Sequence, residues 1–217
     1  ANDLKLIFLI SAASFVIGFL FTIKLPNPVQ EKELTPGTTK TVILKNKFLF
    51  LSLLLRHIGA AAVWTILPIM IVEKLGGELY HISIVYVANT MTAFILMNVM
   101  ASKIHLSNVT KFKIGIGFTT FVFVGLSVVT EWWMAMPFMA LVGATWAFLF
   151  IGGNFHLMEN NPKSTSTGIF SSTLSIATVI GPIIAGSIAF LFDYVAVMYF
   201  AIAIIIVAFV VSLKIKK

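Results

Sequence analysis

The stretch FLFLSLLLRHIGAAAVWTILPIMIV, residues 48–72, decides the class of fold. A hydrocarbon core about 30 Å thick needs roughly 20 apolar residues when the chain crosses it as a helix, and this run is long enough. The run does not alternate between polar and apolar residues, as a membrane β-strand would. Because lipid offers no water to backbone groups, a transmembrane helix is the remaining solution. Arg56 and His57 interrupt the helix, and their role is the main functional question.

The composition extends this conclusion to the whole chain. The 217 residues are 59% hydrophobic and 11% charged, whereas typical soluble domains carry about 25% charged residues. The mean hydropathy is +1.02. A water-soluble fold could not cover its surface with this composition, so we predict a polytopic membrane protein. The chain has no cysteine, which gives it no disulfide framework and no thiolate metal site.

Seven segments meet the length requirement for a membrane-spanning helix. The predicted fold class is therefore all-α, a polytopic transmembrane helical bundle with seven spans and the lipid bilayer as its surroundings. The predicted spans are residues 4–25, 48–72, 80–101, 112–130, 133–158, 166–190 and 194–213.

The basic residues predict the orientation of these spans. If the loops after the first, third, fifth and seventh spans share one side, that side carries twelve of the fifteen basic residues. The other side carries Lys5 and Lys74, and Arg56 lies inside a span. By the positive-inside rule, the lysine-rich side is cytoplasmic. We therefore expect an integral protein of the plasma membrane with the N-terminus of this chain outside and its C-terminus cytoplasmic. Topology also explains the net charge of +7 without binding to nucleic acid.

The loops divide the chain into three parts. Residues 1–25 form a transmembrane helix, residues 26–47 a polar, proline-bearing cytoplasmic linker, and residues 48–217 a bundle of six closely connected helices. The first apolar run is too long for a signal peptide and no cleavage site follows it. Since the chain begins with Ala1 and a span follows almost at once, we expect it to be a fragment of a longer protein.

This layout resembles the major facilitator superfamily of secondary transporters, from helix six through the central loop to helices seven to twelve. The sequence VEKLGGELYHISIVYVAN, residues 72–89, is similar to the family's short turn between helices seven and eight. The sequence NPKSTSTGIFSSTLSIATVIGPIIAGSIAFLF, residues 161–192, is similar to its helix eleven, with Gly181, Pro182 and Gly186. The loop MASKIHLSNVTKFKIG, residues 100–115, departs from the family because it lacks the Asp-Arg pair often found there. A charge relay is therefore not carried over.

The resemblance implies one half of a transporter of a small solute. Such a half faces an N-terminal half-bundle around a central cavity, and rocking of the two halves gives alternating access. That half-bundle is missing from this chain, which should not transport alone unless it self-associates. The alternative is a polytopic membrane protein without transport activity, such as a signalling or assembly subunit. No catalytic motif or pair of carboxylates occurs in a span, so we expect neither an enzyme nor a bound cofactor.

Arg56 and His57 are the first candidates for the substrate pathway. At 1.5 Å per residue, Arg56 lies roughly 5–8 Å inside the hydrocarbon core from its cytoplasmic side. It could reach the headgroups without any function, or it could face the cavity and attract an anion. No acidic residue lies within a predicted span, so an intramembrane partner would come from elsewhere. His57 is a candidate for proton coupling, and a hydrogen bond between helices is the structural alternative.

Further candidates follow from helical periodicity. His57, Ala60, Ala61, Trp64 and Pro68 share one face, which suits either close helix packing or the wall of a pocket. Tyr86 and Asn89 share a face of the next span, where Asn89 lines a cavity or holds helices together.

Residues in the span 133–158 complete the pathway candidates. Thr145, Trp146 and Asn154 lie in its central and cytoplasmic parts, and Trp146 could stack on a substrate or fill the core. Its paired glycines suggest a kink or a close backbone contact. With the hydroxyl-rich helix 166–190, they give the candidates for helix bending and gating, which are Gly152, Gly153, Gly181, Pro182 and Gly186. His156 and Glu159 could hold a metal by spacing, but a solvated pair fits better because no third ligand is near.

Overall fold

The computed structural model describes residues 2–23 and 39–215, and every regular element within them is a helix. The chain divides into two compact units, residues 1–33 and residues 34–217. The first unit contains α1 (Asn2–Ile23). This all-helical architecture agrees with the predicted fold class.

Six helices of the second unit are long and apolar enough to cross a membrane, among the helices that the structure describes. They correspond to the last six predicted spans. Helix α1 (Asn2–Ile23) corresponds to the first predicted span, and its stretch Phe8–Ile23 is apolar. The chain is thus an integral membrane protein by the length and composition of six helices, and the seventh span remains a prediction.

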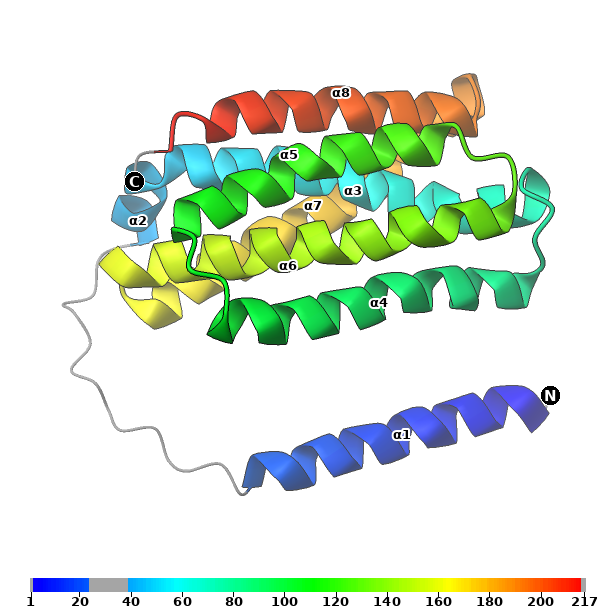
Figure 1. The fold of residues 1–217 in the computed structure, drawn as a ribbon, viewed down its shortest axis with the longest axis horizontal. Helices are drawn as coiled ribbons and strands as arrows, with labels where there is room; N and C mark the ends of the chain where they lie inside the picture. The colour runs from blue at the N-terminus through cyan, green and yellow to red at the C-terminus, as the bar shows by residue number, and fades with distance from the viewer. Residues whose placement is uncertain (1, 24–38, 216–217) are drawn as a thin grey trace. The chain divides into compact units, whose positions relative to one another are not determined.

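The long helices of the second unit lie side by side, with their axes running in nearly the same direction (Figure 1). The elements in chain order are α2 (Thr39–Lys45), α3 (Lys47–Glu73), α4 (Leu79–Ser102), α5 (Asn108–Ser127), the short 3-10 helix η1 (Trp132–Met134), α6 (Ala135–Asn160), α7 (Lys163–Leu191) and α8 (Tyr194–Ser212).

Part of the predicted linker is ordered as a helix. Residues 39–45 form α2, which buries Val42 and contacts α3 and α7. Residues 26–38 of the predicted linker lie outside the described residues. In the described part of the second unit, a short helix packed against the bundle therefore precedes the first long helix.

Helix α5 begins four residues before the predicted span 112–130, at Asn108. The hydroxyl of Ser107 accepts a hydrogen bond from the backbone N–H of Thr110 at 3.3 Å and so caps the helix. Lys111 and Lys113 lower the mean hydropathy of the first turns, so a hydropathy argument does not detect this start. Lys111 is buried, and the ammonium of Lys113 donates to the carbonyl of Ile215 at 3.0 Å, beyond the end of α8.

Close helix contacts depend on small residues, as expected for helices that pack within a membrane. Helix α3 packs against α7 and α8, while α6 packs against α4 and α5. Gly115 of α5 lies against the backbone of Leu149 in α6, and Gly143 of α6 lies against the carbonyl of Asn89 in α4. A side chain at either glycine would force the helices apart.

Burial differs sharply among the helices. In the most apolar stretch of α3, 61% of the residues are buried inside the bundle, whereas α4 has 6% and α7 has 17%. Helix α3 is therefore the most buried of the six long helices, and α4 and α7 present their sides outward.

Candidate functional site

A cavity of about 370 Å³ lies between α3, α4 and α6. It falls in the size range of small-molecule sites, which is roughly 300–1,000 Å³. Its wall carries polar and aromatic side chains from all three helices together with the aliphatic Val142; the lining residues are Arg56, His57, Trp64, Tyr86, Asn89, Val142 and Trp146. Six of the eight predicted pathway residues thus meet around one cavity, although they are spread over ninety residues of sequence.

The other two predicted pathway residues lie elsewhere. Thr145 is buried and its hydroxyl donates to the carbonyl of Val142 at 2.8 Å, one turn earlier in α6. Asn154 donates to the carbonyl of Phe150 at 3.1 Å. Both polar groups are satisfied within their own helix. Val142 lines the cavity but was not among the candidates, because an apolar residue in an apolar helix carries no distinctive signal.

The guanidinium of Arg56 lies inside the bundle. The residue is 1% exposed, so its side chain does not run along the lipid-facing surface to the headgroups. Its Nε and Nη2 atoms donate to the hydroxyl oxygen of Thr119 in α5, at 3.4 and 3.2 Å. The hydroxyl of Thr119 in turn donates to the carbonyl of Gly115 at 2.6 Å. Thr119 thereby fixes the guanidinium while remaining bonded to its own helix.

Trp146 contacts both polar residues of α3. The guanidinium carbon of Arg56 lies 5.7 Å from the centre of the Trp146 ring, within the range of a cation–π contact. The ring of His57 lies 5.6 Å from the same tryptophan ring, at a tilt of 33°. Nδ1 of His57 is buried and has no hydrogen-bond partner among the described residues. His57, a residue of the cavity wall, therefore keeps one imidazole nitrogen unpaired within the described residues.

Tyr86 connects α4 to α3 beside the cavity. Its hydroxyl donates to the carbonyl of Trp64 at 3.2 Å, and the two rings lie 5.8 Å apart. Because Trp64 precedes Pro68, which lacks an N–H, its carbonyl has no backbone donor four residues on. The tyrosine hydroxyl satisfies this carbonyl and holds the two aromatic rings of the wall together.

Replacement of Tyr86 by phenylalanine tests this connection. The variant keeps the ring contact with Trp64 and removes one hydrogen bond, so we expect a loss of about 0.5–1.5 kcal/mol of stability. Thermal unfolding of the purified protein in detergent measures this loss. Tyr199→Phe is the matched control, since Tyr199 is 62% exposed on α8 and should be neutral. Equal midpoints for the two variants would contradict the role given to Tyr86.

The glycine and proline candidates for bending have different surroundings. Gly152 lies against the backbone of Asn108 and Phe112 in α5, and Gly153 lies against the rings of Phe112 and Phe170. Helix α6 continues through both glycines to Asn160. Their shared feature is close packing, which was one of the two predicted roles.

In α7, two candidate glycines five residues apart differ completely. Gly181 lies against the backbone of α3, whereas nothing lies within 4 Å of the position of a side chain at Gly186. Pro182 lies inside α7, which continues to Leu191. Gly181 thus holds α7 close to α3, the helix that carries Arg56 and His57.

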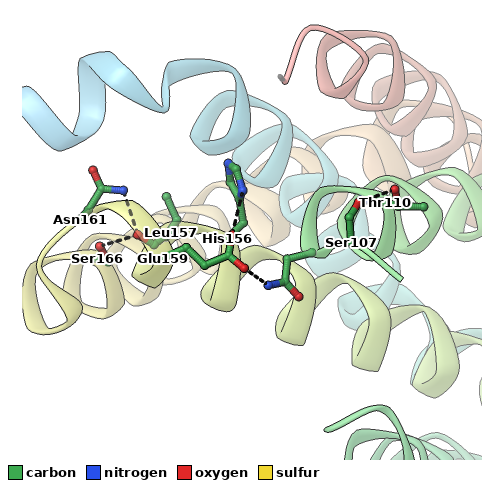
Figure 2. A network of polar contacts seen from close by, with 8 residues as sticks. Ser107, Thr110, His156, Leu157, Glu159, Asn161 and Ser166 are labelled. Carbon is green, nitrogen blue, oxygen red and sulfur yellow. Dashed lines mark hydrogen bonds and ion pairs between the residues drawn. The ribbon is translucent and has the colours of Figure 1, made fainter. Parts of the chain in front are cut away.

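A second polar cluster connects the ends of α5, α6 and α7 (Figure 2). Glu159 accepts a hydrogen bond from Asn108 at 2.5 Å and lies 4.0 Å from Nδ1 of His156. The carbonyl of Leu157 accepts from Asn161 at 2.8 Å and from Ser166 at 3.4 Å. Within the described part of the chain, no three metal-binding side chains gather in one place. The contacts of Glu159 with Asn108 and of Leu157 with Ser166 tie the ends of these helices together.

Comparison with known proteins gives no relative from which a function could be transferred. No protein-family model matches the sequence, and no curated protein matches it significantly. The functional argument therefore depends on the chemistry of the cavity. A guanidinium can hold an anion, aromatic rings can stack on a planar molecule, and the amide of Asn89 can donate or accept a hydrogen bond.

Proposed function

We propose that this chain is the C-terminal half of a secondary transporter of the major facilitator type, which moves a small solute by alternating access. The observation that carries the proposal is the polar and aromatic cavity between α3, α4 and α6, three helices that are otherwise apolar. Polar and ionisable groups within membrane helices are expensive and mark substrate pathways. A cavity at the interface of two half-bundles is the expected place for a transporter site.

The outward-facing sides of α4 and α7 support the proposal that a companion half-bundle packs against this chain. These helices have the smallest buried shares among the six long helices. The exposed side of α7 also carries a group of hydroxyl side chains, which are Ser171, Ser172, Ser175 and Thr178. Hydroxyls at a helix surface favour contact with another helix over contact with lipid. A second six-helix bundle against this side would complete the cavity wall.

The charges at the helix ends support the proposed orientation. Helices α3, α5 and α7 begin at one end of the bundle, where Lys47, Lys113 and Lys163 lie. At the opposite end, α3 finishes at Glu73 and α8 begins after Asp193. We place the protein in the plasma membrane. Under the positive-inside rule, the lysine-rich end of the bundle then faces the cytoplasm.

Accessibility of the cavity from both sides of the membrane tests the proposal. The chain has no cysteine, so only cysteines of the companion half would have to be replaced before single cysteines in this half are labelled. We expect Asn89→Cys and Val142→Cys, in the complete protein, to react with a membrane-impermeant maleimide in intact cells and in inside-out vesicles. Alternating access requires this two-sided reaction, because each state opens the cavity to one side.

The control is Val124→Cys in α5, which is 46% exposed on the outside of the bundle and should react from neither side. Reaction of both cavity cysteines from one side only, under all solute conditions, would contradict transport. That result would favour the alternative of a polytopic membrane protein without transport activity, such as a signalling or assembly subunit.

A further inference from the structure

We infer that the cavity binds an organic monoanion, a planar apolar body with one carboxylate, and that Arg56 contacts the carboxylate. This inference names the substrate class for the proposed transporter and rests on that proposed function. The solute would enter with its ring against the aromatic wall and its charge toward α3.

The first argument is that Arg56 carries a buried charge without a counter-charge. Among the described residues, the ion pairs are Lys74 with Asp193 and His156 with Glu159, and neither involves Arg56. The described carboxylates lie at or next to helix ends, and the nearest in sequence, Glu73, is the last residue of α3, whereas Arg56 lies in its first half. A buried charge is unfavourable unless it is paired and hydrogen-bonded. An anion in the cavity would provide the missing partner.

The second argument is that the guanidinium retains free donors. A guanidinium has five N–H donors in a planar fork, and the Nε and Nη2 atoms of Arg56 both donate to the single hydroxyl oxygen of Thr119. Arg56 also lines the cavity. The fork matches the two oxygens of a carboxylate. Since Arg56 is the only guanidinium or ammonium in the described cavity wall, the site suits one negative charge rather than two.

The third argument concerns the rest of the wall. Trp64, Tyr86 and Trp146 give it three aromatic rings from three helices, which suit the faces of a planar apolar molecule. Asn89 adds one amide that can bond a polar substituent. An inorganic anion would leave these rings without contact, so the whole wall favours an aromatic carboxylate.

Binding of matched acids and amides to the complete, purified protein tests this inference. Equilibrium dialysis with radiolabelled benzoate and naphthoate is compared with benzamide and naphthamide, which keep the ring and lose the charge. We expect at least one acid to bind saturably and at least tenfold more tightly than its amide. Arg56→Gln should remove this preference, and Arg56→Lys should retain part of it, because an ammonium keeps the charge without the fork.

Lys111→Gln is the matched control, since Lys111 is also a buried cation but does not line the cavity. Its acid preference should equal that of the unaltered protein. Equal binding of acid and amide, or no binding of either acid, would overturn the inference, as would an Arg56→Gln protein that keeps the preference. If the Arg56→Gln protein does not fold, the comparison of acid with amide binding to the unaltered protein still tests whether the cavity prefers an anion.

The outcomes separate this inference from the proposed function. Two-sided labelling of Asn89→Cys without acid binding would keep the transporter and overturn the anion site, leaving Arg56 to pair with a carboxylate of the companion half. Acid binding with one-sided labelling would keep the anion site and overturn transport.

Discussion

Gly181→Ala should lower the thermal unfolding midpoint of the purified protein, whereas Gly186→Ala should leave it unchanged or raise it slightly. A Cβ at position 181 would lie 2.6 Å from Cβ of Ala61, 2.7 Å from the carbonyl oxygen of Ile58 and 2.9 Å from the backbone nitrogen of Ala62. Two of these atoms belong to the backbone of α3 and cannot rotate away, so α7 and α3 must separate.

Overpacking of this kind costs about 1–3 kcal/mol, against a gain in helix propensity of about 1 kcal/mol for replacing glycine by alanine. The gain alone applies at Gly186, where nothing lies within 4 Å. Intrinsic fluorescence during heating in detergent measures both midpoints. Equal midpoints for the two variants would show that the close approach of α7 to α3 is not what Gly181 provides.

The effect of Gly181 should extend to the cavity. Ile58, Ala61 and Ala62 follow directly after Arg56 and His57 on α3. Displacement of this part of α3 would change the position of the guanidinium relative to Thr119, which lies on α5. We therefore expect the Gly181 variant to lose stability and ligand binding together.

Hydropathy predicted the helices well because spanning a membrane requires long apolar runs. It placed the start of α5 four residues late, since Lys111 and Lys113 lower the apolar content of its first turns. The helix start depends instead on a local bond, the cap from Ser107 to the N–H of Thr110. A sum of residue hydropathies does not include such a hydrogen bond.

Polar and aromatic residues within spans pointed to most of the cavity wall, because such residues are rare where lipid surrounds a helix. The sequence did not determine what these residues face, because periodicity assigns residues to one side of a helix but does not say what lies against that side. Thr119 was missed for a related reason. Its hydroxyl can bond the carbonyl of Gly115 in its own helix, so the sequence gives no sign of its contact with Arg56, which lies 63 residues earlier.

The glycines show most clearly that a local sequence pattern does not reveal contacts with neighbouring helices. The sequence placed Gly181 and Gly186 in one group of bending candidates, because both lie in one small-residue helix beside Pro182. Their difference depends on the neighbouring helix, which approaches Gly181 and leaves Gly186 open. Tertiary contacts, which no local pattern encodes, decide which glycine is required.

His57→Gln should abolish solute uptake driven by a pH gradient while leaving solute exchange without a gradient intact. His57 lines the cavity and has a buried Nδ1 without a partner in the described chain. Among the cavity residues, histidine is the one whose ordinary titration falls between pH 5 and 8. Glutamine keeps a polar side chain of similar size and cannot carry the proton.

Uptake into proteoliposomes that contain the complete protein measures both activities. His105→Gln is the control, because His105 lies in the exposed loop between α4 and α5 and should have no effect. Unchanged driven uptake in His57→Gln would remove His57 from the coupling mechanism. If one proton on His57 enters with one monoanion on Arg56, no net charge crosses the membrane with the solute. Uptake should then respond to the pH gradient and be insensitive to an imposed membrane potential, and a clear response to potential would rule out this stoichiometry.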